Sequence, residues 1–264
     1  MEKNKIAVIT GAGSGIGLAT ARMLNEKGYT VYNLSRHPAE NEKNKFIFAD
    51  VSDSATISAA VEQVIDESGR IDLLVTSAGM GVSGAGEFIE KKEMKPQFEG
   101  NLFGTINTVK AVLPQMRKQK GGRIICISSV AAVYSIPFQA YYSASKAAIN
   151  SFVDALTNEV KAFGIEVASV MPGDISTGFT AARSKTNAGD DVYSGVIGSA
   201  VSAMEKDEKN GMTPDSVAKL VVKVAEKKHI SPLYTAGFQY KALVFLSRIF
   251  PHKLAVKIVG GLYK

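Results

Sequence analysis

Short apolar segments of strand length alternate along this chain with longer segments whose apolar residues recur at helical spacing. This alternation constrains the fold more than any other feature, because strands separated by helices pair in parallel through right-handed crossovers. The expected strands cover residues 6–10, 30–35, 46–50, 71–76, 122–128, 165–170 and 230–235, and the expected helices cover 15–27, 54–66 and 141–163, with a further helical stretch around 109–116. We therefore predict an α/β fold of the doubly wound class, a three-layer sandwich around a parallel sheet of about seven strands.

The chain is expected to form a single domain spanning residues 1–264. Its length and its 45% apolar content are sufficient for one sizeable core, and no Pro/Ser-rich linker or internal repeat divides it. Residues 180–191 are polar and rich in Ala, Ser, Asn and Gly, which predicts a mobile loop.

Charge and cysteine content exclude several classes of protein. The net charge of +6 is scattered, with no run of five or six like charges, which favours a solvated surface over nucleic-acid binding. The single cysteine, Cys126, cannot form an internal disulfide, and no Cys, His or carboxylate cluster has metal-ligand spacing. With no signal-like start and no continuous apolar run of transmembrane length, we expect a cytoplasmic protein without a transmembrane span, a metal or a nucleic-acid partner.

A glycine-rich turn, TGAGSGIG at residues 10–17, joins the first expected strand to the first helix. Gly11 permits a tight turn, and Gly15 and Gly17 allow backbone to approach a pyrophosphate at the positive end of the helix. Many glycine turns have no ligand, but the position between strand and helix favours a dinucleotide cofactor. This makes the expected sandwich Rossmann-type.

The second chemical signal is Tyr142, followed four residues later by Lys146. Residues four apart share one face of a helix, so the phenol and the ammonium point into the same site. A nearby ammonium lowers the pKa of a phenol toward the range useful for proton transfer. Ser129, thirteen residues before the tyrosine at the end of an expected strand, has a hydroxyl suited to holding a substrate oxygen. The pattern also fits an ordinary amphipathic helix.

These motifs occur in an order that resembles the short-chain dehydrogenase/reductase family, over about the first 180 residues. The motifs are TGxxxGxG at 10–17, Asp50-Val51, Ala78-Gly79, Asn101, Ser129, Tyr142-x-x-x-Lys146 and Pro172-Gly173. Each is weak alone, but the ordered set is specific. The resemblance implies a catalytic tetrad of Asn101, Ser129, Tyr142 and Lys146.

The resemblance also implies a role for each of these residues. Tyr142 would donate a proton to the substrate oxygen as hydride arrives from a nicotinamide, and Ser129 would hydrogen-bond that oxygen. Lys146 would bind the nicotinamide ribose and lower the tyrosine pKa, while Asn101 would hold a water that relays protons to the lysine. The implied cofactor contacts are Gly11, Ser14, Gly15, Ile16, Gly17, Ser35, Arg36, Asp50, Val51, Ala78, Gly79, Tyr142, Lys146, Pro172, Gly173, Ile175 and Thr177.

The end of the second expected strand indicates which cofactor is used. Ser35 stands where an acidic residue would favour NAD, and Arg36 follows with a guanidinium suited to a 2′-phosphate. Because the acid is absent as well, we expect NADP(H) to be preferred over NAD(H). An exposed loop arginine is the alternative interpretation of Arg36.

Two residues compete with the expected serine and tyrosine, and one motif departs from the family pattern. Ser128 and Tyr141 adjoin the expected serine and tyrosine, but the thirteen-residue and four-residue spacings favour Ser129 and Tyr142. Thr76-Ser77 replaces the Asn-Asn that often precedes Ala-Gly in the family, so Thr76 is expected to support the neighbouring backbone less well. We interpret this as a variant that retains activity.

Beyond Thr177 the resemblance weakens, and residues 174–212 are expected to form the substrate loop or lid. Its apolar members, which form either a pocket wall or ordinary core, are Phe179, Val192, Tyr193, Val196 and Ile197. Residues 238–264 form a C-terminal extension in which apolar residues alternate with cations and Pro251 separates two short helices. We favour packing of this extension within the protein or against a second subunit, and keep contact with a membrane surface as the alternative.

Together these features predict an NADP(H)-dependent oxidoreductase that interconverts a ketone and a secondary alcohol, with a lipophilic steroid- or acyl-type carbonyl as the small-molecule substrate. The alternatives are a catalytically idle NADP-binding sensor and a membrane-peripheral scaffold of the same fold. An idle protein is expected to lose the tyrosine or the lysine, and neither is lost. The resemblance also implies a homodimer or homotetramer.

Overall fold

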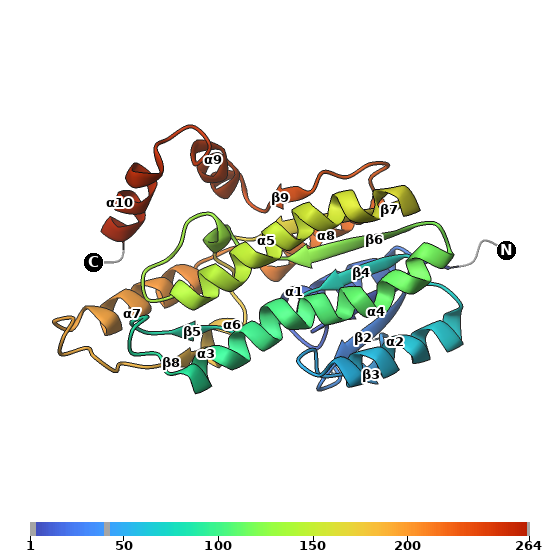
Figure 1. Cartoon of the computed structure of the whole chain (residues 1–264), viewed down its shortest axis with the longest axis horizontal. Coiled ribbons are helices and arrows are strands. Elements are labelled where there is room, and N and C mark those ends of the chain that lie inside the picture. Colours follow the sequence, from blue (N-terminus) through green and yellow to red (C-terminus); the bar gives the residue numbers. More distant parts are fainter. Residues whose placement is uncertain (1–3, 40–42, 263–264) are drawn as a thin grey trace.

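The computed structural model describes residues 4–39 and 43–262 and is built around a seven-stranded parallel sheet (Figure 1). The strands are β1 (Ile6–Thr10), β2 (Thr30–Ser35), β3 (Lys45–Phe48), β4 (Leu73–Thr76), β6 (Gly122–Ile127), β7 (Ile165–Met171) and β9 (Leu233–Thr235). Their order in the sheet is β3-β2-β1-β4-β6-β7-β9. The predicted doubly wound, Rossmann-type sandwich is therefore confirmed.

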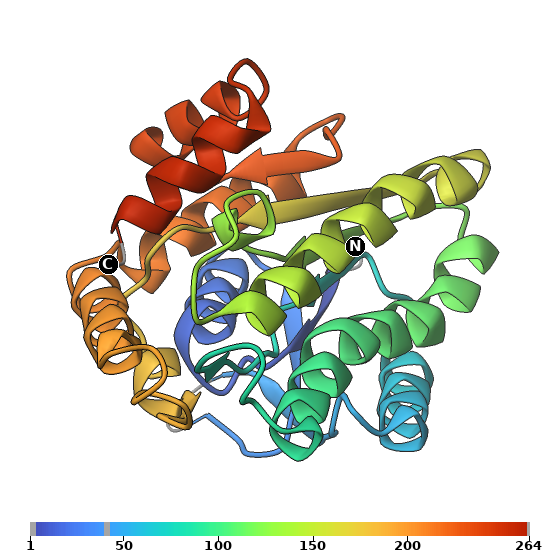
Figure 2. The same ribbon diagram turned by 60° about the vertical axis from the view of Figure 1, so that its left-hand side comes forward.

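Helices cover both faces of the sheet (Figures 1 and 2). On one face lie α2 (Ser54–Ser68), α4 (Gly104–Lys118) and α5 (Ala140–Val160), and on the other α1 (Gly15–Glu26) and α8 (Pro214–Glu226). Successive side chains of a strand point to opposite faces, so Val8 packs into the first core and Ile9 into the second. Because both faces are covered, the strands are apolar without alternation.

The strand order reverses between β1 and β4. From β1 the chain proceeds outward through β2 and β3, and it then returns to place β4, β6, β7 and β9 on the other side. A crevice opens at such a point beyond the carboxyl ends of the strands. The glycine turn after β1 and the Ala78-Gly79 pair after β4 both lie there.

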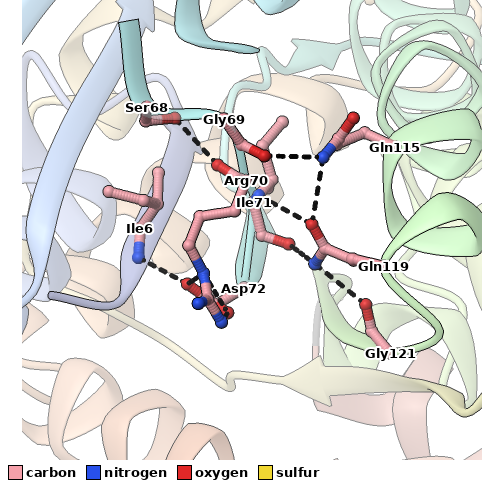
Figure 3. Close-up of polar contacts among 9 residues, drawn as sticks. All are labelled: Ile6, Ser68, Gly69, Arg70, Ile71, Asp72, Gln115, Gln119 and Gly121. Carbon is pink, nitrogen blue, oxygen red and sulfur yellow. Dashed lines mark hydrogen bonds and ion pairs between the residues drawn. The ribbon is translucent and has the colours of Figure 1, made fainter. Parts of the chain in front are cut away.

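At the amino-terminal ends of the strands, opposite the crevice, a polar network bonds the backbone (Figure 3). Asp72 accepts a hydrogen bond from the Ile6 amide at 2.8 Å and pairs with Arg70. The Gln119 side chain from the end of α4 accepts from the Ile71 amide and donates to the carbonyls of Ile71 and Gly121. This network satisfies backbone groups at the amino ends of the strands and leaves the other edge free for chemistry.

Replacing Gln119 by alanine is expected to destabilise the fold without altering the crevice. Three backbone groups would lose their partner, at a cost of about 1–3 kcal/mol in the free energy of unfolding. Urea unfolding followed by circular dichroism measures this. Gln63→Ala is the matched control, because Gln63 is exposed on α2 and donates only to Glu67. Equal stability of the two variants would contradict the role given to Gln119.

Between β7 and α8 the structure is more ordered than the sequence suggests. Residues 180–191 contain the end of α6 (Phe179–Ala182) and β8 (Ser184–Lys185), which pairs with β5 (Val82–Ser83) in a second small sheet. Arg183 is buried and forms an ion pair with Glu208 of α7 (Val196–Lys209). The prediction of a mobile loop is therefore wrong for 180–185, where a buried ion pair and strand pairing outweigh the polar composition.

The C-terminal segment, residues 238–262, consists of α9 (Phe238–Leu246) and α10 (His252–Leu262), joined around Pro251 as expected. In Figure 1 both helices project from the body of the molecule. Within the described chain, Val244 is the one fully buried side chain of this segment. The expectation that the segment buries its apolar residues within the protein is thus wrong for this single chain, because no other element covers α10.

Candidate active site

A large cavity lies at the carboxyl ends of β1, β4, β6 and β7. Its volume is about 1310 Å³, larger than the common range of roughly 300–1,000 Å³ for small-molecule pockets. It extends from the glycine turn, past the ends of β4 and β6, to the helices of the C-terminal segment. The cavity therefore has room for an extended cofactor and a substrate together.

The glycine turn is shaped by contacts that only glycine allows. Gly11 has φ of +68°, and a Cβ there would lie 2.8 Å from the Ala78 Cα. A Cβ on Gly17 would lie 2.4 Å from the Gly11 carbonyl oxygen. The Ser14 side chain makes no capping hydrogen bond, so the first-turn amides of α1 face the cavity without a side-chain partner. This is a cradle suited to a pyrophosphate.

The end of β2 borders the same cavity. The Ser35 hydroxyl donates to the His37 carbonyl at 2.6 Å, so it is held within its own loop. Arg36 also lines the cavity and lies close enough to Asp50 to lower its carboxyl pKa, after the larger effect of hydrogen bonds from Ser52. Among the described residues that follow β2, 36–39, there is no carboxylate, and Arg36 provides a guanidinium. The residues present thus fit an adenosine ribose bearing a 2′-phosphate.

Tyr142 projects into the cavity from the first turn of α5. It is half-buried, and its ring lies 5.7 Å from that of Phe179 across the pocket. Burial raises the pKa of Tyr142 to about 12, and a hydrogen bond with Ser129 opposes this rise. The phenol therefore keeps its proton at neutral pH, which is the form that can donate one.

Lys146 lies one turn further along α5 and is buried. Its Nζ is 5.8 Å from the centre of the Tyr142 ring and donates to the Ile127 carbonyl at 2.9 Å. Burial lowers the pKa of Lys146 to about 8. Desolvation of the phenol dominates the net shift of the Tyr142 pKa, so the expected lowering of that pKa by Lys146 stays a prediction.

Asn101 is buried in a π-helical turn, Glu99–Phe103, just before α4. Its side chain accepts from the Met80 amide at 2.8 Å and donates to the Met80 carbonyl at 3.0 Å. A Cβ on Gly79 would lie 3.1 Å from the Asn101 Oδ1 and 3.8 Å from the Lys146 Nζ. Asn101 thus fixes the strand end beside the lysine and does not itself line the cavity.

The neighbours of the serine and the tyrosine are engaged elsewhere. Ser128 donates to the Lys146 carbonyl at 2.9 Å, and Tyr141 donates to the Gly86 carbonyl at 2.8 Å. Thr76 is buried at the end of β4, and its hydroxyl makes no hydrogen bond to the neighbouring backbone. These contacts agree with the choices made from spacing.

The remaining expected contacts gather around the same cavity, with one exception. The residues from the predicted cofactor set that line it are Gly11, Ser14, Gly15, Ile16, Ser35, Arg36, Asp50, Val51, Ala78, Gly79, Tyr142, Lys146, Pro172, Gly173, Ile175 and Thr177. Gly17 lies behind Gly11 and acts through packing. Of the five apolar lid residues, Phe179 alone lines the cavity, while Ile197 and Tyr193 pack in a separate core under α7. The pocket-wall interpretation is therefore wrong for the others.

Sequence reasoning missed two features of the site. Glu208, from α7, lines the cavity and accepts hydrogen bonds from Arg183 and Thr180. Tyr240, from α9, donates to Asp174 Oδ2 at 2.6 Å and accepts from the Asp174 amide at 3.1 Å. Both join segments far apart in the chain, and no local spacing signals such pairs.

The chain resembles characterised and uncharacterised oxidoreductases. A family model described as short chain dehydrogenase matches residues 5–188. A 3-ketodihydrosphingosine reductase of Bacteroides thetaiotaomicron is 43% identical over 228 residues, which cover 85% of each chain. The uncharacterized oxidoreductase YusZ of Bacillus subtilis is 35% identical over 265 residues, 94% of each chain. The crystal structure of a short-chain dehydrogenase from Streptomyces avermitilis has a TM-score of 0.83 at 27% identity and covers 94% of both chains.

Proposed function

This chain belongs to the short-chain dehydrogenase family of oxidoreductases, and on that premise we propose that it is an NADP(H)-dependent reductase of a lipophilic ketone. The observation that carries the proposal is the position of Ser129, Tyr142 and Lys146 in the cavity that also contains the glycine cradle. The expected proton donor and the cofactor cradle thus line the same cavity.

The side chains suggest how the reduction proceeds. Tyr142 donates its proton to the ketone oxygen, and Ser129 hydrogen-bonds the same oxygen and orients the carbonyl. The buried ammonium of Lys146 stabilises the phenolate that Tyr142 becomes. A bound nicotinamide cofactor supplies the hydride. The phenol is protonated at neutral pH, as proton donation to a ketone oxygen requires.

Cofactor preference is expected to change with Ser35 and Arg36. Ser35→Asp/Arg36→Ala removes the guanidinium and places a carboxylate where a ribose hydroxyl binds, so the NADP(H)-over-NAD(H) affinity ratio should fall roughly 10- to 100-fold. Fluorescence titration with both reduced cofactors measures the ratio. Arg117→Ala is the control, because Arg117 is an exposed arginine of α4 outside the cavity. An unchanged ratio in the double variant would rule out this assignment.

The substrate is proposed to be a long-chain ketone. The cavity continues past Tyr142 and Phe179 to Leu243, Ile258 and Leu262, an apolar path suited to an acyl chain. One relative bears the name 3-ketodihydrosphingosine reductase, and we place a sphingoid-type ketone first among the candidates. We further propose that the enzyme works in the cytoplasm as a homodimer or homotetramer.

A ketone panel tests the function. Long-chain, steroid and short water-soluble ketones are incubated with NADPH or NADH, and cofactor oxidation is followed by absorbance. We expect the long-chain ketones to give the highest kcat/KM, with NADPH as donor. If no ketone is reduced faster than the no-substrate background, the proposed function is wrong.

A further inference from the structure

The positive charge of this chain is concentrated at its C-terminal end. Residues 227–264 contain seven Lys or Arg residues and no Asp or Glu, although the whole chain has 31 basic and 25 acidic residues. The rest of the chain is therefore close to neutral. Four of the seven, Lys241, Arg248, Lys253 and Lys257, lie within the described C-terminal segment, residues 238–262.

The same segment carries most of the exposed apolar surface. Among the described residues, nine of the fourteen large apolar side chains that are exposed lie within 238–262. Phe238 is 89% exposed, Leu262 69%, and Phe245 and Ile249 61% each. An apolar surface of this kind marks a site of contact with another apolar body.

One side of this segment opens onto the cavity. Leu243 of α9 and Ile258, Val259 and Leu262 of α10 line the cavity that contains Tyr142. The residues Phe238, Phe245, Ile249, Phe250, Leu254 and Val256 do not line it. The segment thus has some apolar side chains on the cavity and others exposed outside it.

The segment is attached to the body through α9. The Tyr240 ring packs on Gly173, where a Cβ would lie 2.2 Å from the ring, and its hydroxyl bonds Asp174. The Tyr134 hydroxyl donates to the Leu243 carbonyl at 2.6 Å. α9 therefore has a fixed position relative to the site, and α10 extends from it.

From these observations we propose that the C-terminal segment docks the enzyme onto a bilayer containing anionic phospholipid, with the cavity mouth against the membrane. A bilayer provides acyl chains for the phenylalanines and aliphatic residues and anionic headgroups for the cations. A second copy of the segment provides only like charge, since it contains no acidic residue. None of the described helices is long and apolar enough to span a membrane, so the segment lies in the interface.

This docking deepens the proposed function and rests on it for its biological meaning. A long-chain ketone dissolved in the membrane would enter the cavity between the apolar side chains of α9 and α10. It would reach Tyr142 without exposing its acyl chain to water. Such exposure is unfavourable because water solvates apolar surface poorly. The segment would then set which substrates reach the site and leave the chemistry unchanged.

Vesicle co-sedimentation with the full chain tests the docking. Vesicles of phosphatidylcholine with about 30 mol% phosphatidylglycerol are compared with pure phosphatidylcholine, at low salt and at about 0.5 M NaCl. We expect the bound fraction to fall at least about fivefold without the anionic lipid or at high salt. A bound fraction that is negligible on the anionic vesicles, or insensitive to their charge, would overturn the proposal.

Two double variants locate the contact. Phe245→Ser/Ile249→Ser removes exposed apolar side chains and Lys253→Gln/Lys257→Gln removes two cations, and each should reduce binding at least about fivefold. The matched controls are Phe48→Ser and Lys219→Gln/Lys223→Gln. Phe48 is exposed on β3, and the lysine pair is exposed on α8 at the same four-residue spacing. Controls that lose as much binding as the segment variants would contradict the assignment.

Activity and size measurements separate the remaining outcomes. With a water-soluble ketone the segment variants should keep the parental kcat/KM, whereas kcat/KM for a long-chain ketone in anionic vesicles should fall at least about tenfold. Loss of oligomer size in light scattering, with vesicle binding intact, would make the segment a subunit interface and overturn the proposal. If no ketone is reduced at all, the proposed function fails, and co-sedimentation still decides the docking.

Discussion

Tyr142→Phe is expected to lower kcat for ketone reduction by roughly 10²- to 10⁴-fold while cofactor affinity stays within about twofold of the parent. The substitution removes one hydroxyl and keeps the ring that packs against Phe179. Stopped-flow absorbance gives the rate, and fluorescence titration gives the cofactor affinity. Loss of rate with intact binding would identify the phenol as the proton donor.

Tyr141→Phe is the matched control for this prediction. Tyr141 is the preceding residue on the same helix, but its hydroxyl donates to the Gly86 carbonyl and points away from the cavity. Its loss should change kcat by less than about threefold. Equal rates for Tyr142→Phe and the parent would exclude Tyr142 as the acid, and equal losses in the two variants would assign the effect to packing.

Lys146→Met is expected to reduce kcat at least about 100-fold and to change how stability depends on pH. The pKa of Lys146 is about 8 in the folded chain, against an ordinary value of 10.5. Between these pH values the unfolded chain binds a proton that the folded chain does not, so the parental free energy of unfolding rises with pH. A shift of this size contributes about 3 kcal/mol over the window.

The pH dependence distinguishes this buried charge from a general packing effect. Urea unfolding at pH 7 and near pH 10 gives the stability of each protein at both ends of the window. The variant lacks the ammonium and should lack this part of the rise, whatever its stability at neutral pH. Lys110→Gln, at an exposed position on α4, should rise in parallel with the parent. Parallel curves for Lys146→Met and the parent would contradict the prediction.

The sheet and its two helical layers were predictable because the signals are local. Each strand is an apolar run bounded by polar or glycine residues, and handedness then dictates how such runs pair. The boundaries differ by a few residues at β3, β4 and β9, where the strands end earlier or begin later than their apolar runs. A strand ends where its hydrogen bonds to the neighbouring strand end, and the hydrophobicity of the sequence does not indicate that position.

Candidate site residues were predictable for a related reason. The carboxyl ends of parallel strands meet at one edge, so Ser129 after β6 and the glycine turn after β1 come together without any long-range information. Tyr142 and Lys146 share one helix face. Their pKa values were not predictable from spacing, because burial depends on the lid and on Phe179, which come from distant segments.

The region after β7 was the least predictable. Arg183, Glu208 and Tyr240 each act through a partner at least 25 residues away, and no periodicity marks such pairs. The apolar residues of α10 were expected to be buried because an amphipathic helix usually covers a core. In the described chain α10 leaves Leu254, Val256, Ile258 and Leu262 exposed, and helical periodicity alone does not say what covers such a face.

The single cysteine has a consequence for following the protein in solution. Cys126 is fully buried on β6, and burial raises the pKa of its thiol to about 11. A thiol so protonated and enclosed does not react with alkylating reagents until the central strands separate. Its modification rate therefore reports the frequency with which the whole sheet opens, not the breathing of a loop. The alkylation rate of the Cys126 thiol thus measures global unfolding of the native chain, without an introduced dye or cysteine.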